Sequence, residues 1–290
     1  MDSSLYLPAV LLTLLVAIVL FTLAVVYYPP LCLLRAINNR TSPSLRFIFS
    51  LPSTEKFIAL SFDDSPTPST PKILDILRAH GVKATFFIIG QYAQEYPDLV
   101  KRIKAEGHEL ANHTQFDRAA WRLGMSELEE DIRFVDGLLV PAISTSTSGF
   151  EGEEDEDENL DKSLLTSHNL SSNLETTSPS ASCSKTPEWF RPGHGIVTKR
   201  MLNMVATRFE NKETLLASIF PYDTTFPFAG WNASYVLSRL HPGAIVCLHD
   251  GRPWSIKTLE TVLQGAEERG YSVGTCGAAW KLSQKYESLD

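Results

Sequence analysis

The sequence predicts an α/β protein in which parallel strands alternate with crossover helices, preceded by an N-terminal transmembrane helix. Short apolar runs typical of buried strands alternate with segments of helical periodicity, and this alternation resumes after a polar stretch at 141–186. A separate apolar run covers residues 5–28. In folds of this class the reactive groups collect at the carboxyl ends of the strands, so the residues that follow each strand are the first candidates for a functional site.

The composition suits a globular chain and argues against a nucleic-acid partner. The 290 residues are 43% hydrophobic and 21% charged, with a formal net charge of −8 from 26 basic and 34 acidic residues. Nine of the acids but only two of the bases lie in 141–186, which leaves 24 bases and 25 acids elsewhere. No basic patch of the kind that binds nucleic acid is present in this balance. Four cysteines are too few for a disulfide framework and match no zinc-binding spacing.

The apolar run at 5–28 is long enough to cross a bilayer, so we expect these residues to contact lipid and residues 1–4 to form a short tail. Tyr27 and Tyr28 stand where interfacial aromatic residues belong, and the prolines at 29 and 30 end the helix. A cleaved signal peptide is the alternative. No basic residue precedes the run, however, and its 24 residues exceed the usual signal core of about 7–15 residues.

The orientation of this helix is left open by the residues themselves. Three arginines (35, 40 and 46) follow the span, and the positive-inside rule would therefore keep the body of the protein in the cytoplasm. Four glycosylation sequons, at Asn39, Asn112, Asn169 and Asn232, favour the opposite orientation.

Residues 29–54 are expected to form a linker, and residues 55–290 a single domain interrupted at 141–186. The predicted strands are 57–62, 84–89, 109–112, 215–220, 244–248 and 272–276. The predicted helices are 70–80, 91–106, 126–138, 201–209, 231–240 and 256–269, the 126–138 helix being opened by a capping box at Ser126. A turn is expected at 63–66. The acidic segment at 141–186 lacks periodicity and is predicted to be a disordered, solvated insertion away from the chemistry.

Polar residues of a hydrolytic type follow several of these strands. They are Asp63, Asp64, His113, Asp117, Arg191, His194, Gly195, Asp223, His249 and Asp250. An aspartate pair after a strand is commonly a turn, and a single histidine there is commonly a satisfied polar group. Their joint occurrence at successive strand ends predicts a hydrolytic metal site.

At these positions the sequence resembles the polysaccharide deacetylase family, the NodB-homology carbohydrate esterases. The resemblance covers 45–140 and 187–282. The family motifs Thr-Phe-Asp-Asp-Gly, His-Ser/Thr-x-x-His, Arg-x-Pro-x-Gly and Leu-x-His correspond to Ser61-Phe62-Asp63-Asp64-Ser65, His113-Thr114-Gln115-Phe116-Asp117, Arg191-Pro192-Gly193-His194-Gly195 and Cys247-Leu248-His249. An Asp-Trp element is matched most weakly, by Asp223 without a tryptophan.

The resemblance implies a distorted (β/α) barrel of the NodB-homology type and a divalent metal, usually zinc, with Co²⁺ or Mn²⁺ as alternatives. Its ligands here would be Asp64, His113 and Asp117, the last replacing the family's second histidine. A carboxylate is an acceptable zinc ligand, although its charge weakens the metal as a Lewis acid. The alternative is that Asp117 only forms a local hydrogen bond. Ser65, in place of glycine, matters only if the turn needs a positive φ.

The resemblance also implies the residue roles. Asp63 would be the general base, oriented by Arg191, and His249 the general acid, kept charged by Asp223. The oxyanion would be held by the metal and by a backbone N–H in the segment of His194 and Gly195.

The preferred function is therefore an N-deacetylase that acts on an N-acetylglucosamine polymer or oligosaccharide, such as chitin, and releases acetate. A catalytically degenerate member that binds glycan and a hydrolase of another small-molecule C–N bond are the alternatives. A glycan polymer lies outside the cytoplasm, so we expect a single-pass membrane protein with its catalytic domain luminal or extracellular and the sequon at Asn112 unmodified. No protein partner is implied. Cys247 and Cys276 are expected to be buried thiols rather than a disulfide.

Overall fold

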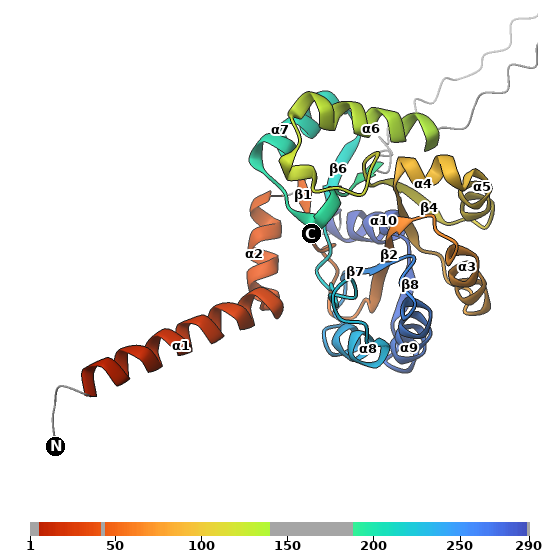
Figure 1. Cartoon of the computed structure of the whole chain (residues 1–290). Coiled ribbons are helices and arrows are strands. Elements are labelled where there is room, and N and C mark those ends of the chain that lie inside the picture. Colours follow the sequence, from red (N-terminus) through yellow and green to blue (C-terminus); the bar gives the residue numbers. More distant parts are fainter. Residues whose placement is uncertain (1–5, 42–43, 140–187, 289–290) are drawn as a thin grey trace, which may run out of the picture. The chain divides into compact units, whose positions relative to one another are not determined.

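The computed structural model describes residues 6–41, 44–139 and 188–288 (Figure 1). The expected insertion at 141–186 and the tail at 1–4 lie outside the described residues, so both remain predictions.

One parallel sheet organises the described part of the soluble body, with helices around it (Figure 1). Its strands are β1 (Leu45–Arg46), β2 (Phe57–Ser65), β3 (Thr85–Ile88), β4 (Glu109–Asn112), β5 (Glu188–Phe190), β6 (Lys212–Leu215), β7 (Ile245–His249) and β8 (Ser272–Gly274). Their order is β1-β6-β5-β4-β3-β2-β7, and β8 also pairs with β2. All seven pairings are parallel, which confirms the predicted distorted (β/α) barrel.

The helices follow the predicted alternation with small shifts, except for the last one, which was not predicted and which begins at Cys276, where the final strand was expected to end. They are α3 (Thr70–Ala79), α4 (Gly90–Glu95), α5 (Pro97–Ala105), α6 (Met125–Leu139), α7 (Lys199–Arg208), α8 (Ala229–Ser238), α9 (Ser255–Glu268) and α10 (Cys276–Glu287), with 3₁₀ turns η1 (Ala120–Arg122) and η2 (Gly193–Gly195). The single helix expected at 91–106 is divided at Pro97, because proline has no N–H to continue a helix and fits its first position. The capping box expected at Ser126 is wrong, since α6 already begins at Met125.

Alternate side chains of strand β2 point to opposite faces of the sheet, one toward the larger hydrophobic cluster and the other toward the face that carries the site. On β2, Ile58, Leu60 and Phe62 are fully buried in the larger hydrophobic cluster, which also contains residues of α3 and α9. Ala59, between them, belongs to a second cluster with residues of the neighbouring strands. Because successive side chains of a strand point to opposite faces, Asp63 continues the inner face on which Ala59 lies.

Two expectations near β2 and β6 are corrected. The turn predicted at 63–66 is instead the end of β2, which reaches Ser65 because Ser65 pairs with Ile88 and its carbonyl accepts a hydrogen bond from the N–H of Ile89, at 2.9 Å. The strand predicted at 215–220 ends at Leu215, and only Ile219 makes a bridge to Val246. The apolar character of 57–62 and 215–220 predicts strands there, but it does not fix where pairing stops.

The segment expected as a linker, 29–54, is partly folded. It contains helix α2 (Leu31–Thr41) and strand β1, which pairs with β6. The Asn38 side chain is buried and accepts hydrogen bonds from the N–H groups of Phe47 and Ile48. Arg46 forms an ion pair with Glu213 at 3.1 Å. The Asn38 contacts join α2 to the stretch that follows β1, whereas Arg46, the β1–β6 pairing and the buried Phe49 attach the segment to the body.

Helix α1 (Tyr6–Tyr27) has the length and composition of a membrane span. Its window Val10–Tyr27 has a mean hydropathy of 2.9, and none of it is buried against the protein. Its C-terminal end contacts the body through two tyrosine pairs, Tyr27 with Tyr222 and Tyr28 with Tyr235, each with ring centroids 4.9 Å apart. The hydroxyl of Tyr235 also donates to the carbonyl of Tyr27, at 2.8 Å.

Candidate active site

A cleft of about 770 Å³ lies at the carboxyl ends of the strands. Of the site residues proposed from the sequence, eight line it: Asp63, Asp64, His113, Asp117, Arg191, His194, Gly195 and His249. Asp223 is buried behind His249. The parallel sheet brings these residues together because β2, β4, β5 and β7 all end at the same edge.

Asp63 is held by Arg191. The Nη1 of Arg191 donates to Oδ1 of Asp63 at 2.5 Å and to the Ser61 hydroxyl at 3.0 Å, and its guanidinium lies 3.8 Å from the centre of the Phe87 ring. Burial raises the pKa of Asp63, but the charge of Arg191, with two nearby histidines, outweighs that effect and leaves the pKa below its ordinary value. Asp63 is therefore an ionised carboxylate with one oxygen fixed by arginine.

His249 is held by Asp223. The two oxygens of Asp223 accept one hydrogen bond from the backbone N–H of His249 and one from its Nδ1, both at 2.8 Å. Burial opposes the imidazolium, but the hydrogen bond and charge of Asp223 prevail and raise the pKa of His249 to about 8. The indole of Trp254 donates to the Asp223 carbonyl at 2.7 Å. A tryptophan thus contacts Asp223 after all, although it comes from a distant part of the sequence.

A carboxylate oxygen of Asp64 and a ring nitrogen of His113 face each other in the cleft. His113 Nδ1 lies 2.7 Å from the carbonyl of Arg191, which can only accept, so Nδ1 carries the proton. In the neutral imidazole Nε2 is then the atom with the lone pair, and it lies 3.7 Å from Oδ1 of Asp64 and 3.8 Å from Oδ2 of Asp63. Burial raises the pKa of Asp64. A nitrogen and a carboxylate oxygen oriented in this way fit as two ligands of a divalent cation.

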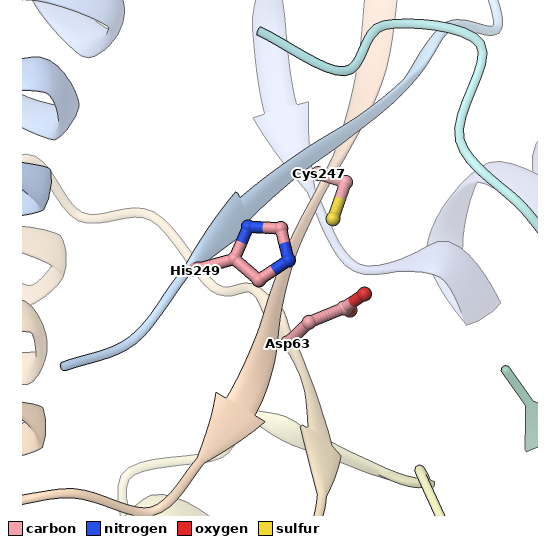
Figure 2. Close-up of side chains that lie close together, drawn as sticks. All are labelled: Asp63, Cys247 and His249. Carbon is pink, nitrogen blue, oxygen red and sulfur yellow. The ribbon is translucent and has the colours of Figure 1, made fainter. Parts of the chain in front are cut away.

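Asp117 does not join this pair closely. Its side chain is 45% exposed, and its Oδ1 lies 4.0 Å from Nε2 of His194. Within the described residues, the one set of three potential ligands whose donor atoms all lie within 4.8 Å of one another is Asp63, Cys247 and His249 (Figure 2). The arrangement therefore supplies two of the three family ligands, and Asp117 as the third remains a prediction.

The segment expected to stabilise an oxyanion has an unusual backbone conformation, and one of its two amide groups already donates a hydrogen bond within the protein. His194 and Gly195 both have left-handed backbone conformations, with φ of 63° and 65°. The N–H of Gly195 donates to the carbonyl of Pro192 at 3.0 Å, so the amide of His194 is the remaining donor of the pair. The imidazole of His194 is itself 56% exposed.

Arg252 contacts a predicted metal ligand and was not anticipated from the sequence. Its Nη2 lies 3.0 Å from Oδ2 of Asp64, the oxygen that does not face His113. Arg252 comes from the loop after β7, and no motif or periodicity marks it. A cation would share Asp64 with this guanidinium.

Asp250 explains why serine is acceptable at position 65. Its buried carboxylate accepts hydrogen bonds from the hydroxyls of Ser65, Thr67 and Thr70 at 3.2, 2.7 and 2.5 Å. The left-handed conformation in this segment belongs to Asp64, with φ of 59°, and Ser65 does not share it. The glycine of the family motif is therefore not needed here, and Ser65 helps to fix the loop that carries Asp64.

Comparison with known proteins agrees with this geometry. A sequence profile of the polysaccharide deacetylase family matches residues 50–151. A chitooligosaccharide deacetylase of Bradyrhizobium sp. is 29% identical over 239 residues, which cover 76% of this chain and 89% of the relative. These matches confirm the resemblance to the polysaccharide deacetylase family that the motifs indicate. The prediction of an enzyme of the polysaccharide N-deacetylase class is thereby confirmed at the level of the family, whose members are generally metal-dependent.

Other relatives match in part or in fold. A peptidoglycan-N-acetylglucosamine deacetylase of Bacillus cereus is 41% identical over 97 residues, 33% of this chain and 46% of its own length. A solved peptidoglycan N-acetylglucosamine deacetylase superimposes with a TM-score of 0.61 at 24% identity, covering 82% and 93% of the two chains. A family pseudoenzyme from Bacillus anthracis does so with a TM-score of 0.61 at 20% identity, over 83% and 70%. These two likenesses show the fold.

Proposed function

We propose that this protein hydrolyses N-acetyl groups of an N-acetylglucosamine-containing polysaccharide or oligosaccharide, chitin-like, and releases acetate. The arrangement of Asp63 and His249 carries the proposal. A carboxylate oxygen of Asp63 and a ring nitrogen of His249 lie within 4.8 Å of each other at one cleft, and each residue is held by its own buried partner. An ionised base and a protonated acid on either side of one reacting carbon are what amide hydrolysis needs.

The residues of the chain would act as follows. Asp63 removes a proton from the attacking water, and Arg191 keeps the other carboxylate oxygen in place. His249, held protonated by Asp223, donates its proton to the departing amine. The backbone amide of His194 offers a hydrogen bond to the developing oxyanion.

Asp64 and His113, with Asp117 as the proposed third ligand, would hold a divalent metal, zinc in the first instance and Co²⁺ or Mn²⁺ as alternatives. When bound, such a cation supplies a Lewis acid for the acetamide carbonyl. Elemental analysis of the purified full chain identifies the metal.

Acetate release tests the function directly. The metal-replete full chain is expected to release acetate from chitooligosaccharides or from N-acetylated peptidoglycan fragments, and Asp63→Asn should abolish the release while the circular dichroism spectrum stays unchanged. Absence of acetate from every N-acetylated glycan tried would overturn the proposal.

A catalytically degenerate glycan-binding protein is the second candidate, favoured by two observations. The Asp117 carboxylate is not grouped with Asp64 and His113, and Arg252 pairs with Asp64. This candidate predicts glycan binding without a tightly held metal. One metal equivalent in the purified protein, lost in Asp64→Ala, would rule it out.

We also propose that residues 5–28 span a bilayer and that the catalytic body is luminal or extracellular, where a glycan polymer is found. The exposed apolar surface of α1 supports a lipid environment for that helix. Protease treatment of sealed, cytosol-side-out vesicles should spare the body until the vesicles are permeabilised. Immediate digestion would refute the orientation.

A further inference from the structure

Cys247 lies on the same face as the proposed base and acid. Strands β2 and β7 pair in parallel, with Ser61 opposite Cys247 and Asp63 opposite His249. Cys247 and His249 are two residues apart on β7, so their side chains point to the same side of the sheet. Figure 2 shows the sulfur, the imidazole and the carboxylate directed toward a common point. The proposed deacetylation uses Asp63 and His249 but gives the thiol no task.

Each of the three residues keeps one donor atom for that point. Arg191 binds Oδ1 of Asp63, whose Oδ2 lies 3.8 Å from Nε2 of His113. Asp223 binds Nδ1 of His249 and leaves Nε2. The Cys247 sulfur lies 3.8 Å from the Leu248 carbonyl and also contacts the Asp63 carboxylate. Donor atoms of the three residues lie within 4.8 Å of one another, and all three residues line the cleft.

We propose that Asp63, Cys247 and His249 form a binding site for a thiophilic divalent cation of the class of Zn²⁺ and Cd²⁺, separate from the pair Asp64 and His113. Sulfur, imidazole nitrogen and carboxylate oxygen are the three ligand types that zinc takes, and water from the cleft completes four-coordination. Bond lengths of about 2.0–2.3 Å place such ligands about 3.3–3.8 Å apart, so the side chains need to close by about 1 Å. Binding replaces the thiol proton, which leaves to solvent.

The charges near the site determine its affinity for a cation. Arg191 opposes a second positive charge beside Asp63, whereas the carboxylates of Asp223 and Asp64 favour it. The thiolate contributes the further negative charge once the cation has displaced its proton. We therefore expect the site to fill when the cation is in excess, after the site at Asp64 and His113.

Occupancy has a consequence that rests on the proposed function. A cation on Asp63 and His249 takes both the base and the acid out of the reaction. One metal equivalent should then support acetate release, and an excess of Zn²⁺ or Cd²⁺ should suppress it.

Cadmium absorption tests the site without any assay of activity, because a thiolate bound to Cd²⁺ absorbs in the ultraviolet by charge transfer. The probe is the full chain in detergent, with the other cysteines replaced as Cys32→Ser, Cys183→Ser and Cys276→Ser. Titration with Cd²⁺ should produce the band with a stoichiometry of one per chain. The further change Cys247→Ser should remove it. A chain that keeps only Cys276 is the matched control: this thiol is also buried but belongs to no such ligand group among the described residues, and it should give no band.

Activity supplies the second measurement. Suppression of acetate release by excess Cd²⁺ should need about 10-fold or more cation after Cys247→Ser. The proposal is overturned if the folded chain that keeps Cys247 gives no band, or if the band survives Cys247→Ser. If the triple substitution unfolds the chain, the difference spectrum between wild type and Cys247→Ser decides the question. If no glycan yields acetate, the proposed function fails, and the band still decides this site.

Discussion

Nδ1 of His249 lies 2.8 Å from Oδ1 of Asp223, and the second oxygen of the same carboxylate accepts the backbone N–H of His249. The imidazole is therefore fixed in orientation and in tautomer by one buried residue. Trp254 in turn binds the Asp223 carbonyl, at 2.7 Å. The proposed general acid is thus positioned by contacts from two loops.

The protonation of His249 should set the alkaline side of the activity profile. Its pKa is raised to about 8, so the protonated form predominates below that value, and acetate release should fall as the pH rises through it. Asp223→Asn removes the charge that raises the pKa, and the falling limb should move to lower pH. The pH profile of kcat measures this. Asp98→Asn, on the surface beside Lys101, should leave the limb in place; an unmoved limb in Asp223→Asn would contradict the assignment.

Removing the proposed base, Asp63, should lower the rate of acetate release more than removing a contact of the arginine that orients it. Asp63→Asn keeps the size of the side chain but cannot take a proton, and acetate release should fall by about 100- to 10,000-fold. The conservative change Ser61→Ala removes the hydrogen bond from Arg191 and one to the Val246 carbonyl, leaves the contact between Arg191 and Asp63, and should cost far less activity. Both variants should melt as single folded species, monitored by circular dichroism. Activity in Asp63→Asn close to that of the wild type would remove Asp63 from the mechanism.

Arg252 should compete with a metal for Asp64. Their contact is 3.0 Å, and the side chain of Arg252 is 36% exposed, so the ion pair is worth about 1 kcal/mol after solvent screening. Arg252→Gln should therefore tighten divalent-cation binding about 5-fold, as measured by equilibrium dialysis. Arg78→Gln removes a comparable pair with Asp75 far from the cleft and should change nothing. Weaker binding in Arg252→Gln would mean that the arginine supports the metal site instead.

Two sequons should remain unmodified in folded protein. Asn112 is buried and donates to the carbonyl of Ile132, as expected from the sequence. Asn232, whose sequon was counted as evidence for the orientation, is fully buried and donates to the Phe226 carbonyl. A glycan at either position could not be accommodated in the folded body. Mass spectrometry of peptides from protein produced in a secretory host should find both unmodified; a glycan on Asn232 in folded protein would contradict the packing.

Strand ends were the most predictable part of this site. Asp63, Arg191 and His249 follow apolar runs whose parallel pairing could be inferred from the strand–helix alternation, so the sequence alone placed them at one edge. The pairing of Asp223 with His249 was implied by the family motifs, and the structure brings them together. Gly81, Gly107 and Gly270 follow the ends of α3, α5 and α9 with positive φ, the conformation for which glycine is favoured after a helix. Cys247 and Cys276 are free and buried, also as predicted.

Contacts made by loops were not predictable. Arg252 reaches Asp64 from beyond β7, and Trp254 reaches Asp223 from the same loop. A loop has no repeating pattern of apolar residues from which the direction of a side chain could be inferred. Arg252 is 188 residues from Asp64 in the sequence, and Trp254 is 31 residues from Asp223. The folding of 29–54 was missed for a similar reason, since polar contacts of Asn38 hold it.

The end of α1 takes part in the cleft wall itself. Val26 lines the cleft, and its carbonyl accepts a hydrogen bond from Tyr222, the residue before Asp223. With α1 in a bilayer, as proposed, the reacting groups would stand at the level of the lipid headgroups. A glycan would then be reached only where it runs along the membrane surface, and chains held farther out would escape modification. Such an enzyme searches for substrate in two dimensions, and its output depends on how close each polymer lies to the lipid.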